Sequence, residues 1–221
     1  ALDAPESSAG KIVAAAKKGQ KIQLAHVFKQ SIHHYCLREW LALADEELAQ
    51  TYPLSTLPPP YMVDAISAQL VDGFCVGEPW NIQAQIEGYS HVIADSKQII
   101  PEVADKVLAT TQEWAKLHPQ TLTAIETAIQ LAQQDLNTLE SLDEIWQMLE
   151  CSEIIRFSCS SLVHVDEFYK IQHIIRSFGA QGAVKSSDFE WIMLQMCKWD
   201  HLKIEAAKIQ EIAAHCAGQA N

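Results

Sequence analysis

Residues 58–80, PPPYMVDAISAQLVDGFCVGEPW, decide the fold class of this 221-residue chain. Three prolines hold the backbone extended, and apolar residues then repeat at helical spacing from Met62 to Leu70. The apolar run Phe74-Cys75-Val76 is too short for a helix and predicts a buried strand. The strand ends at Gly77-Glu78-Pro79-Trp80, where glycine admits close approach to the backbone and proline suits the first turn of a helix. In an open α/β sheet, ligands bind at such a strand end.

Strands and helices alternate on both sides of this stretch, which predicts an α/β fold with a mostly parallel sheet. The expected strands cover residues 22–28, 52–57, 74–76, 89–94 and 107–109. The expected helices cover residues 11–18, 31–44, 62–70, 79–88, 112–117, 121–134, 141–150, 187–199 and 202–216. Residues 1–10 contain Pro, Ser and Gly and are expected to form a flexible lead-in. The pattern after residue 107 is mainly helical, so we expect a domain boundary near residues 95–110.

The composition argues against several classes of function. Asp and Glu outnumber Lys and Arg by 28 to 16, which gives a formal net charge of −12. Such a charge repels phosphate backbones and no basic cluster offsets it, so we expect no direct nucleic-acid binding. No apolar run reaches the roughly 18 residues of a bilayer span, so we expect no membrane span. The six cysteines form no CxxC pair, which favours a reducing compartment; they occupy positions 36, 75, 151, 159, 197 and 216.

Three segments of the sequence, taken in order, carry a resemblance to a known family. SIHHYCLREWLALA at residues 31–44 is similar to a Ser-x-His…Leu-Arg-x-Trp-Leu helix of that family, and the most specific match is PPPYMVDAI…DGFCVGEPWN at residues 58–81. SSDFEWIMLQMCKW at residues 186–199 is similar to its Ser-Asp-x-x-Trp-x-x-x-Gln-x-x-x-Trp element. Over most of residues 20–200, the chain resembles the nitrate- and bicarbonate-binding proteins of ABC transporters, a branch of the periplasmic solute-binding superfamily.

The resemblance implies a periplasmic-binding-protein type II-like fold, in which the chain crosses between two α/β lobes joined by a hinge. Residues 1–19 are then a lead-in and helix, and residues 20–105 are the second lobe with its mostly parallel sheet. Residues 106–221 are the mainly helical return segment of the first lobe, whose N-terminal part would be absent. Because a closed cleft needs both lobes, we expect these 221 residues to bind nitrate weakly or not at all.

His33 is the first candidate for contact with a ligand. It follows the expected N-cap, Ser31, by two residues. Its ring is therefore expected near unsatisfied backbone N–H groups and the positive end of the helix dipole, which attract anions. The resemblance implies the same role, because a histidine at this place contacts the anion in the family. A surface histidine in a first turn is the alternative interpretation, and His34 is interpreted as structural.

Lys106 is the second candidate, because an ammonium group supplies one charge and three donors to a small oxyanion. The family has Pro-Glu-Lys-Val-Leu-Gly here, whereas in this chain extra residues separate Pro101-Glu102 from Lys106 and Ala109 replaces the glycine. In the family a lysine here goes with nitrate, and an acid that works with calcium goes with bicarbonate, so Lys106 favours nitrate. Pairing of Lys106 with its neighbour Asp105 is the alternative.

The strand end Cys75-Val76-Gly77 is the third candidate, because its backbone N–H groups could bind the same anion without any side chain. An ordinary buried strand end is the alternative. Glu78 is interpreted as compensating the dipole of the next helix, and Trp40 and Trp80 as packing residues. The resemblance also implies an aromatic and an amide contact from the first lobe, which we expect to be absent here.

The sequence favours binding over catalysis, and we expect no cofactor and no metal. It has no HExxH motif, no two histidines four residues apart, no Gly-x-Ser-x-Gly turn and no glycine-rich phosphate loop. His164 and His173 lie nine residues apart, a spacing that does not place them on one helical face.

The resemblance implies two functions of different classes. The first is a periplasmic or membrane-anchored extracytoplasmic solute-binding protein that delivers nitrate to an ABC permease by hinge closure, with nitrite and bicarbonate as alternative solutes. The second is a cytosolic nitrate sensor of the same fold that holds an RNA-binding antiterminator protein and releases it when nitrate binds. An enzyme such as a hydrolase is the third hypothesis, which turnover assays test.

Overall fold

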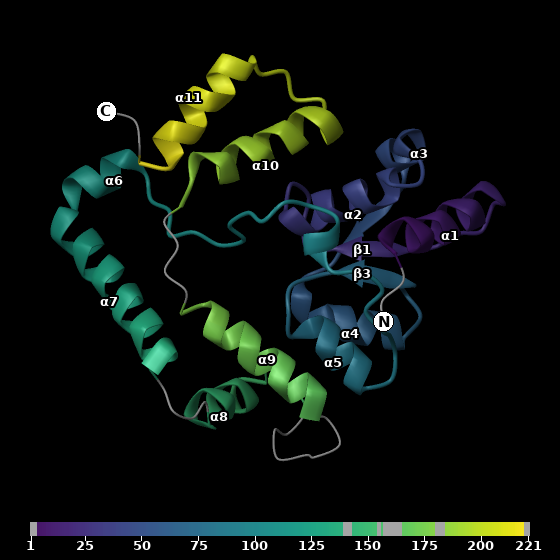
Figure 1. Ribbon diagram of the computed structural model, residues 1–221, viewed down its shortest axis with the longest axis horizontal. Helices are drawn as coiled ribbons and strands as arrows, with labels where there is room; N and C mark the ends of the chain where they lie inside the picture. Colours follow the sequence, from purple (N-terminus) through teal and green to yellow (C-terminus); the bar gives the residue numbers. More distant parts are fainter. Residues whose placement is uncertain (1–3, 139–142, 154–155, 157–164, 180–183, 219–221) are drawn as a thin grey trace. The chain divides into compact units, whose positions relative to one another are not determined.

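The computed structural model describes residues 4–138, 143–153, 156, 165–179 and 184–218. The chain divides into two compact units, one of residues 1–103 with 185–221 and the other of residues 104–184 (Figure 1). The sheet lies in the first unit, and the described part of the second consists of helices and connecting segments. The assignment of residues 20–105 and 106–221 to two lobes stays a prediction.

In the part of the chain that the structure describes, the sheet has three short parallel strands in the order β2-β1-β3. β1 spans Leu24–His26, β2 spans Leu54–Thr56 and β3 spans Gly73–Cys75. Parallel neighbours require a crossover connection, and here helices supply it. The predicted α/β fold with a parallel sheet is confirmed.

Two further predicted strands, at residues 89–94 and 107–109, are wrong, because the structure has no strand at either place. β3 lies at an edge of the sheet, and neither segment pairs with it. Residues 89 and 90 instead close the end of α5, since the N–H groups of Tyr89 and Ser90 both donate to the carbonyl oxygen of Ala84. A strand is held by the hydrogen bonds of a neighbour, which a run of apolar residues does not supply by itself.

The helices of the first unit pack on the sheet or on one another (Figure 1). They are α1 (Pro5–Lys17), α2 (Ile32–Ala42), α3 (Glu46–Thr51), α4 (Met62–Ser67), α5 (Trp80–Ile86), α10 (Ser186–Trp199) and α11 (Ala206–Cys216), with 3₁₀ turns η1 (Pro59–Tyr61) and η2 (Ser96–Gln98). α1 begins at Pro5, so the flexible lead-in expected over residues 1–10 is wrong from that residue on. Proline fits a first helical turn, where its missing N–H group is not needed, and Trp40 Nε1 fixes this end by donating to the Pro5 carbonyl at 3.2 Å.

The two faces of the sheet pack against different helices. Leu24 belongs to a buried cluster with residues of α1, α2, α3 and α10, whereas Ala25 belongs to a second cluster with residues of α4. Successive strand residues point to opposite faces, so α2 and α4 lie on opposite sides of β1. This explains why all three residues of β1 are buried and why a strand of only Leu24–His26 holds its place.

The segment that resembles the family's C-terminal element forms α10, which packs on α2. Trp191 lies against Tyr35, with ring centroids 6.5 Å apart. Eight residues further on, the indole Nε1 of Trp199 donates to Gln195 Oε1 and to Glu39 Oε1, both at 2.9 Å. The Trp-x-x-x-Gln-x-x-x-Trp spacing therefore places one face of α10 against α2, which joins residues about 160 positions apart in the sequence into one core.

The second unit, described by itself, contains α6 (Gln112–Leu117), α7 (Pro119–Thr138), α8 (Asp143–Cys151) and α9 (Val165–Ser177). Residues 141 and 142, expected to start the helix that is now α8, lie outside the described residues. α7 is joined to the end of α9 by Asn137 Nδ2, which donates to the carbonyl of Gly179 at 2.5 Å. Among the described residues, no helix is long and apolar enough to span a bilayer.

Candidate functional site

The carboxyl ends of the three described strands lie level with one another, because His26 is paired with Thr56 on one side and with Cys75 on the other. From β1 the chain passes through α2 to β2, and it later returns to place β3 on the opposite side of β1. The connections after β1 and β3 therefore leave toward opposite faces of the sheet. This is the topological switch point, where open α/β sheets form a crevice for ligands.

The first wall of this crevice is the start of α2. The predicted N-cap is confirmed, since Ser31 Oγ accepts the N–H of His34 at 3.1 Å and donates to the carbonyl of Phe28 at 2.7 Å. His33 is the second residue of the helix and therefore lies in its first turn. Backbone N–H groups of a first turn point out of the helix and carry the positive end of its dipole.

The second wall is the turn after β3, and the structure brings it together with His33. A methyl group added at Gly77 would lie 3.6 Å from Nε2 of His33, so the imidazole faces the glycine backbone directly. A side chain of α5 stabilises this turn, because Asn81 Nδ2 donates to the carbonyl of Val76 at 2.7 Å. Glu78 Oε2 accepts the N–H of Ile82 at 3.1 Å, so its carboxylate serves the start of α5. Contact of these residues with an anion stays a prediction.

The side chains of Cys75 and Val76 pack in the two cores and not toward the crevice. Val76 is buried in the cluster with α4, and the thiol of Cys75 packs against the opposite core. A hydrogen bond with the thiol of Cys36 and burial raise the pKa of Cys75, so the Cys75 thiol is protonated at neutral pH. If residues 75–77 bind an anion, they therefore do so through their backbone.

Lys106 belongs to the second unit, unlike the other predicted site residues. Its ammonium group forms an ion pair with Asp105, and its side chain is 72% exposed. The pairing that the sequence left open is thus present in the structure. A pair this exposed is weak and is readily opened by a competing anion. The role of Lys106 in anion binding stays a prediction.

A pair of buried histidines next to His33 was not identified from the sequence as a unit. His26 ends β1, and its Nε2 lies 3.3 Å from Nδ1 of His34, with the ring centroids 4.6 Å apart. Burial lowers the pKa of His34 to about 4, and burial also lowers the pKa of His26. Both rings are therefore neutral at neutral pH. The sequence places His26 near the end of a predicted strand and His34 in the first turn of the next helix. Only the fold shows that the two rings are in contact.

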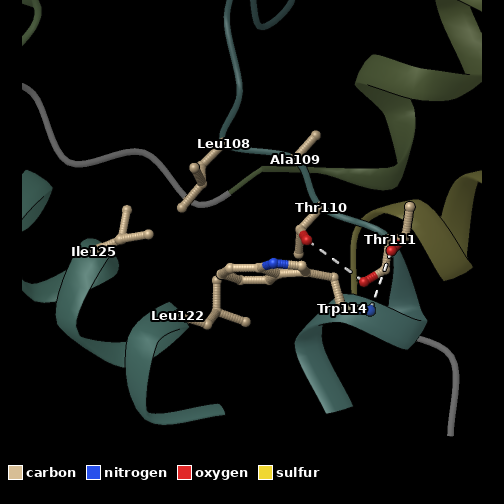
Figure 2. Close-up of a pocket in the computed structure, with 7 residues that line it drawn as sticks. All are labelled: Leu108, Ala109, Thr110, Thr111, Trp114, Leu122 and Ile125. Atoms are coloured by element: carbon tan, nitrogen blue, oxygen red, sulfur yellow. Dashed lines mark hydrogen bonds between the residues drawn. The ribbon is translucent and has the colours of Figure 1, made fainter. Parts of the chain in front are cut away.

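The second unit has a hollow of about 350 Å³ of a different character (Figure 2). Its lining residues are Leu108, Ala109, Thr110, Thr111, Trp114, Leu122 and Ile125. Figure 2 shows the indole of Trp114 extending across the hollow above Leu122. The two hydroxyl groups make local bonds, since Thr111 Oγ1 accepts the N–H of Trp114 at 3.1 Å and Thr110 Oγ1 donates to the carbonyl of Thr111 at 3.5 Å. This lining is apolar and carries no charge, so it does not suit an oxyanion.

The described residues contain no group of three or more His, Cys, Asp or Glu side chains placed to hold a metal ion. Cys159 and His164 lie outside the residues that the structure describes.

Comparison with known proteins gives a consistent result. The sequence model of the NMT1-like family matches residues 3–150. The nitrate/nitrite binding protein NrtA of Nostoc sp. strain PCC 7120 is 28% identical over 223 residues, which cover 94% of this chain and 50% of that protein. The bicarbonate transport ATP-binding protein CmpC of Synechocystis sp. strain PCC 6803 is 37% identical over 114 residues, covering 52% of this chain and 17% of that protein.

The nitrate import ATP-binding protein NrtC of Synechocystis sp. strain PCC 6803 is 30% identical over 190 residues, covering 81% of this chain and 28% of that protein. The crystal structure of the periplasmic nitrate-binding protein NrtA from Synechocystis PCC 6803 has the same fold, with a TM-score of 0.75 at 20% identity, covering 94% of this chain and 57% of that one. The chain thus spans between 17% and 50% of the length of the curated relatives described here.

Proposed function

The chain belongs to the NMT1-like family, and from that premise we propose that it binds a small oxyanion, with nitrate favoured over nitrite and bicarbonate, as the solute-binding part of an ABC import system. The relatives named above are proteins of nitrate or bicarbonate binding and import, which supports this class of solute. Their names describe binding and transport, and we propose no reaction on the solute.

The observation that carries the proposal is the approach of His33 to Gly77 at the switch point of the sheet. An imidazole N–H, a first helical turn and a glycine backbone offer hydrogen-bond donors at one place. A planar anion with three oxygens accepts in-plane hydrogen bonds from several directions, which fits such a set of donors. In a chain of formal net charge −12, an anion site depends on local donors of this kind.

Lys106 supports nitrate over bicarbonate within this class. In the family that the sequence resembles, a lysine at this place goes with nitrate, whereas bicarbonate binders have an acid that works with calcium. A point charge with three donors neutralises a monovalent anion without a metal ion. The proposal therefore predicts that nitrate binding does not require calcium.

We propose an ABC permease as the protein partner and an extracytoplasmic location, as for the periplasmic nitrate-binding protein of the same fold. The alternative, a cytosolic nitrate sensor that sequesters an antiterminator protein, uses the same anion site. Co-purification distinguishes them, because a permease complex and an antiterminator complex contain different proteins.

Titration of the 221-residue chain with sodium nitrate, followed by NMR, tests the anion site at the weak affinity expected here. Matched titrations with nitrite, bicarbonate and chloride give the selectivity. Substitutions His33→Ala and Lys106→Ala should each weaken nitrate binding by about 1–3 kcal/mol, the cost of losing one partner of a charged hydrogen bond. The exposed residues His91 and Lys97 provide matched controls, since His91→Ala and Lys97→Ala should leave nitrate binding unchanged. Unchanged affinity in both site variants would remove the assignment.

A further inference from the structure

The buried pair His26–His34 lies in the same part of the fold as the proposed anion site. Both side chains are almost fully buried, with 2% and 3% of their surfaces exposed. Nδ1 of His34 and Nε2 of His26 are 3.3 Å apart, so one ring donates and the other accepts. A neutral pair carries one N–H proton on each ring, one of them between these two nitrogens, and an additional proton gives the pair a positive charge.

The surroundings of the pair decide when it takes up that additional proton. The charged and titratable groups facing it are Lys29, His33, Tyr35, Arg38, Cys75 and Asp200. The backbone of Phe28 favours a proton on His26, whereas the charge on Arg38, and that on His33 when its ring is protonated, acts against it. The charges on Arg38 and Lys29 act against a proton on His34. Asp200 acts the other way, but its carboxylate already accepts the hydroxyl of Tyr35 at 2.7 Å. Cys75 is neutral.

The pair therefore lies in a buried place surrounded mainly by positive charge. Burial is the largest cause of the lowered pKa of both rings, and the neighbouring cations add to it. A bound anion at His33 and Gly77 would place one negative charge next to the imidazole that already acts electrostatically on His26. This charge offsets the cations, so it favours the protonated pair.

We propose that the His26–His34 pair takes up one proton from solvent when an anion binds between His33 and Gly77, so that anion binding is linked to pH. The inference rests on the anion site proposed above. Linkage is reciprocal: if a bound anion raises proton affinity, a proton raises anion affinity by the same factor. In the bound state, the positive charge of the protonated His26–His34 pair then compensates the negative charge of the anion. Anion affinity should rise as pH falls, by at most about tenfold per pH unit for one linked proton.

The competing explanation is that His33 alone carries any linked proton, because a ring that touches an anion is also stabilised in its charged form. Ring nitrogen NMR distinguishes the two, since the ¹⁵N shifts of each imidazole report its own protonation. Single substitutions assign the signals, with His26→Gln and His33→Gln as the informative pair. Each replaces one ring by an amide that still donates and accepts.

The test is a nitrate titration of the 221-residue chain at several pH values from about 5 to about 7.5, with chloride at equal ionic strength as the control. We expect nitrate affinity to rise toward low pH, and saturating nitrate to raise the pKa read from the His26 or His34 ring signals. The His26→Gln variant should bind nitrate with a flatter pH dependence. The ring signals of the unsubstituted chain answer the question even if that variant does not fold.

The outcomes separate this inference from the proposed function. Nitrate-dependent shifts that spare the signals of His33 and Gly77 at every pH overturn the anion site itself. Nitrate binding with the same affinity at every pH and with unchanged His26 and His34 signals overturns the proton linkage and leaves the anion site standing. Protonation of the His33 ring alone, with an unchanged pH dependence in His26→Gln, likewise overturns the role of the pair.

Discussion

At the residue scale, Gly77 is informative because its missing side chain keeps the space beside the His33 ring open. A methyl group placed there would make an ordinary contact at 3.6 Å with Nε2, and the backbone at this position is not in the left-handed region. Gly77→Ala should therefore fold normally and change the free energy of unfolding by less than about 1 kcal/mol. The methyl group would occupy the volume next to Nε2, so nitrate affinity should fall by about tenfold or more, comparable to losing one charged hydrogen bond.

Nitrate titration and urea unfolding of the same Gly77→Ala sample check both parts of this expectation. A variant that keeps full stability and full nitrate affinity would show that the anion does not use the space between residues 33 and 77. A variant that loses stability as well would not separate the site from the fold, and Gly77→Ser would then serve as a second probe of the same space.

His34 gives a prediction about acid stability. Its pKa is about 4 in the folded chain against an ordinary value of 6.5, so between these values the unfolded chain binds more protons than the folded one. The free energy of unfolding therefore rises with pH in this window. The stabilisation is complete above about pH 6.5 and is lost as pH falls toward about 4, with a total of about 3 kcal/mol from this residue. His26, whose pKa is also lowered, adds in the same direction.

Urea unfolding measured between about pH 4.5 and about pH 7.5 checks this dependence. The control is His215→Gln, which removes an exposed histidine of α11 and should leave the pH dependence unchanged. A free energy of unfolding that stays flat across the window would show that the buried rings are not held neutral.

Residues whose role is local could be predicted from the sequence, and residues whose role depends on distant partners could not. Ser31 precedes a helical pattern, and N-capping needs only the residues that follow, so its position was predictable. His33 could be placed in the first turn for the same reason. His26 and His34 are separated by a turn whose path sets whether their rings meet, and Lys106 pairs with its own neighbour in the structure.

At the scale of the elements, a glycine inside α1 and a glycine just after its end should respond to alanine substitution with opposite changes in stability. Gly10 lies inside the helix, and a methyl group there would meet no atom within 4 Å. Gly10→Ala should stabilise the first unit by about 0.5–1 kcal/mol, because alanine loses less conformational freedom than glycine in a helix. Gly19 follows the helix end with φ of +81°, a conformation that side chains rarely adopt, so Gly19→Ala should destabilise the unit by about 1 kcal/mol.

Thermal unfolding of the two alanine variants tests this contrast with the same chemical change at both positions. Shifts of equal sign would mean that α1 does not end ahead of Gly19, at Lys17, as the structure has it. Circular dichroism of each folded variant serves as the control for unchanged helix content.

The elements also show where patterns in the sequence fail. β1 lies within the segment predicted as a strand at residues 22–28, and the structure buries all three of its residues. The apolar residues at 89–94 and 107–109 gave a similar signal without a neighbouring strand, and strand structure depends on that neighbour. The start of α1 was missed because Pro5 was interpreted as part of a flexible lead-in, although a proline in a first turn favours a helix.

At the scale of the whole molecule, the first unit is made from two segments far apart in the sequence. α10 joins residues 1–103 through Trp199, which is buried and donates to both Glu39 and Gln195. The sequence predicted that α10 exists but not that it packs on α2, because helix spacing shows which face is apolar and not what covers it. The relatives and the shared fold support the same overall arrangement without showing the role of any single residue.

Replacing Trp199 by phenylalanine tests whether these two segments unfold together. Trp199→Phe keeps an aromatic ring but removes the N–H donor, which leaves the buried amide oxygen of Gln195 without this partner. We expect a loss of about 2–4 kcal/mol from the missing hydrogen bonds and the smaller ring. Trp191→Phe is the control, since Trp191 contacts Tyr35 through its ring and a phenyl group keeps that contact, so the loss should be smaller. Hydrogen exchange then locates the effect: amide protection should fall in α1 and α2 as well as in α10, because one cooperative unit opens as a whole. Protection that falls in α10 alone, with α2 unchanged, would show that the C-terminal segment is an independent element.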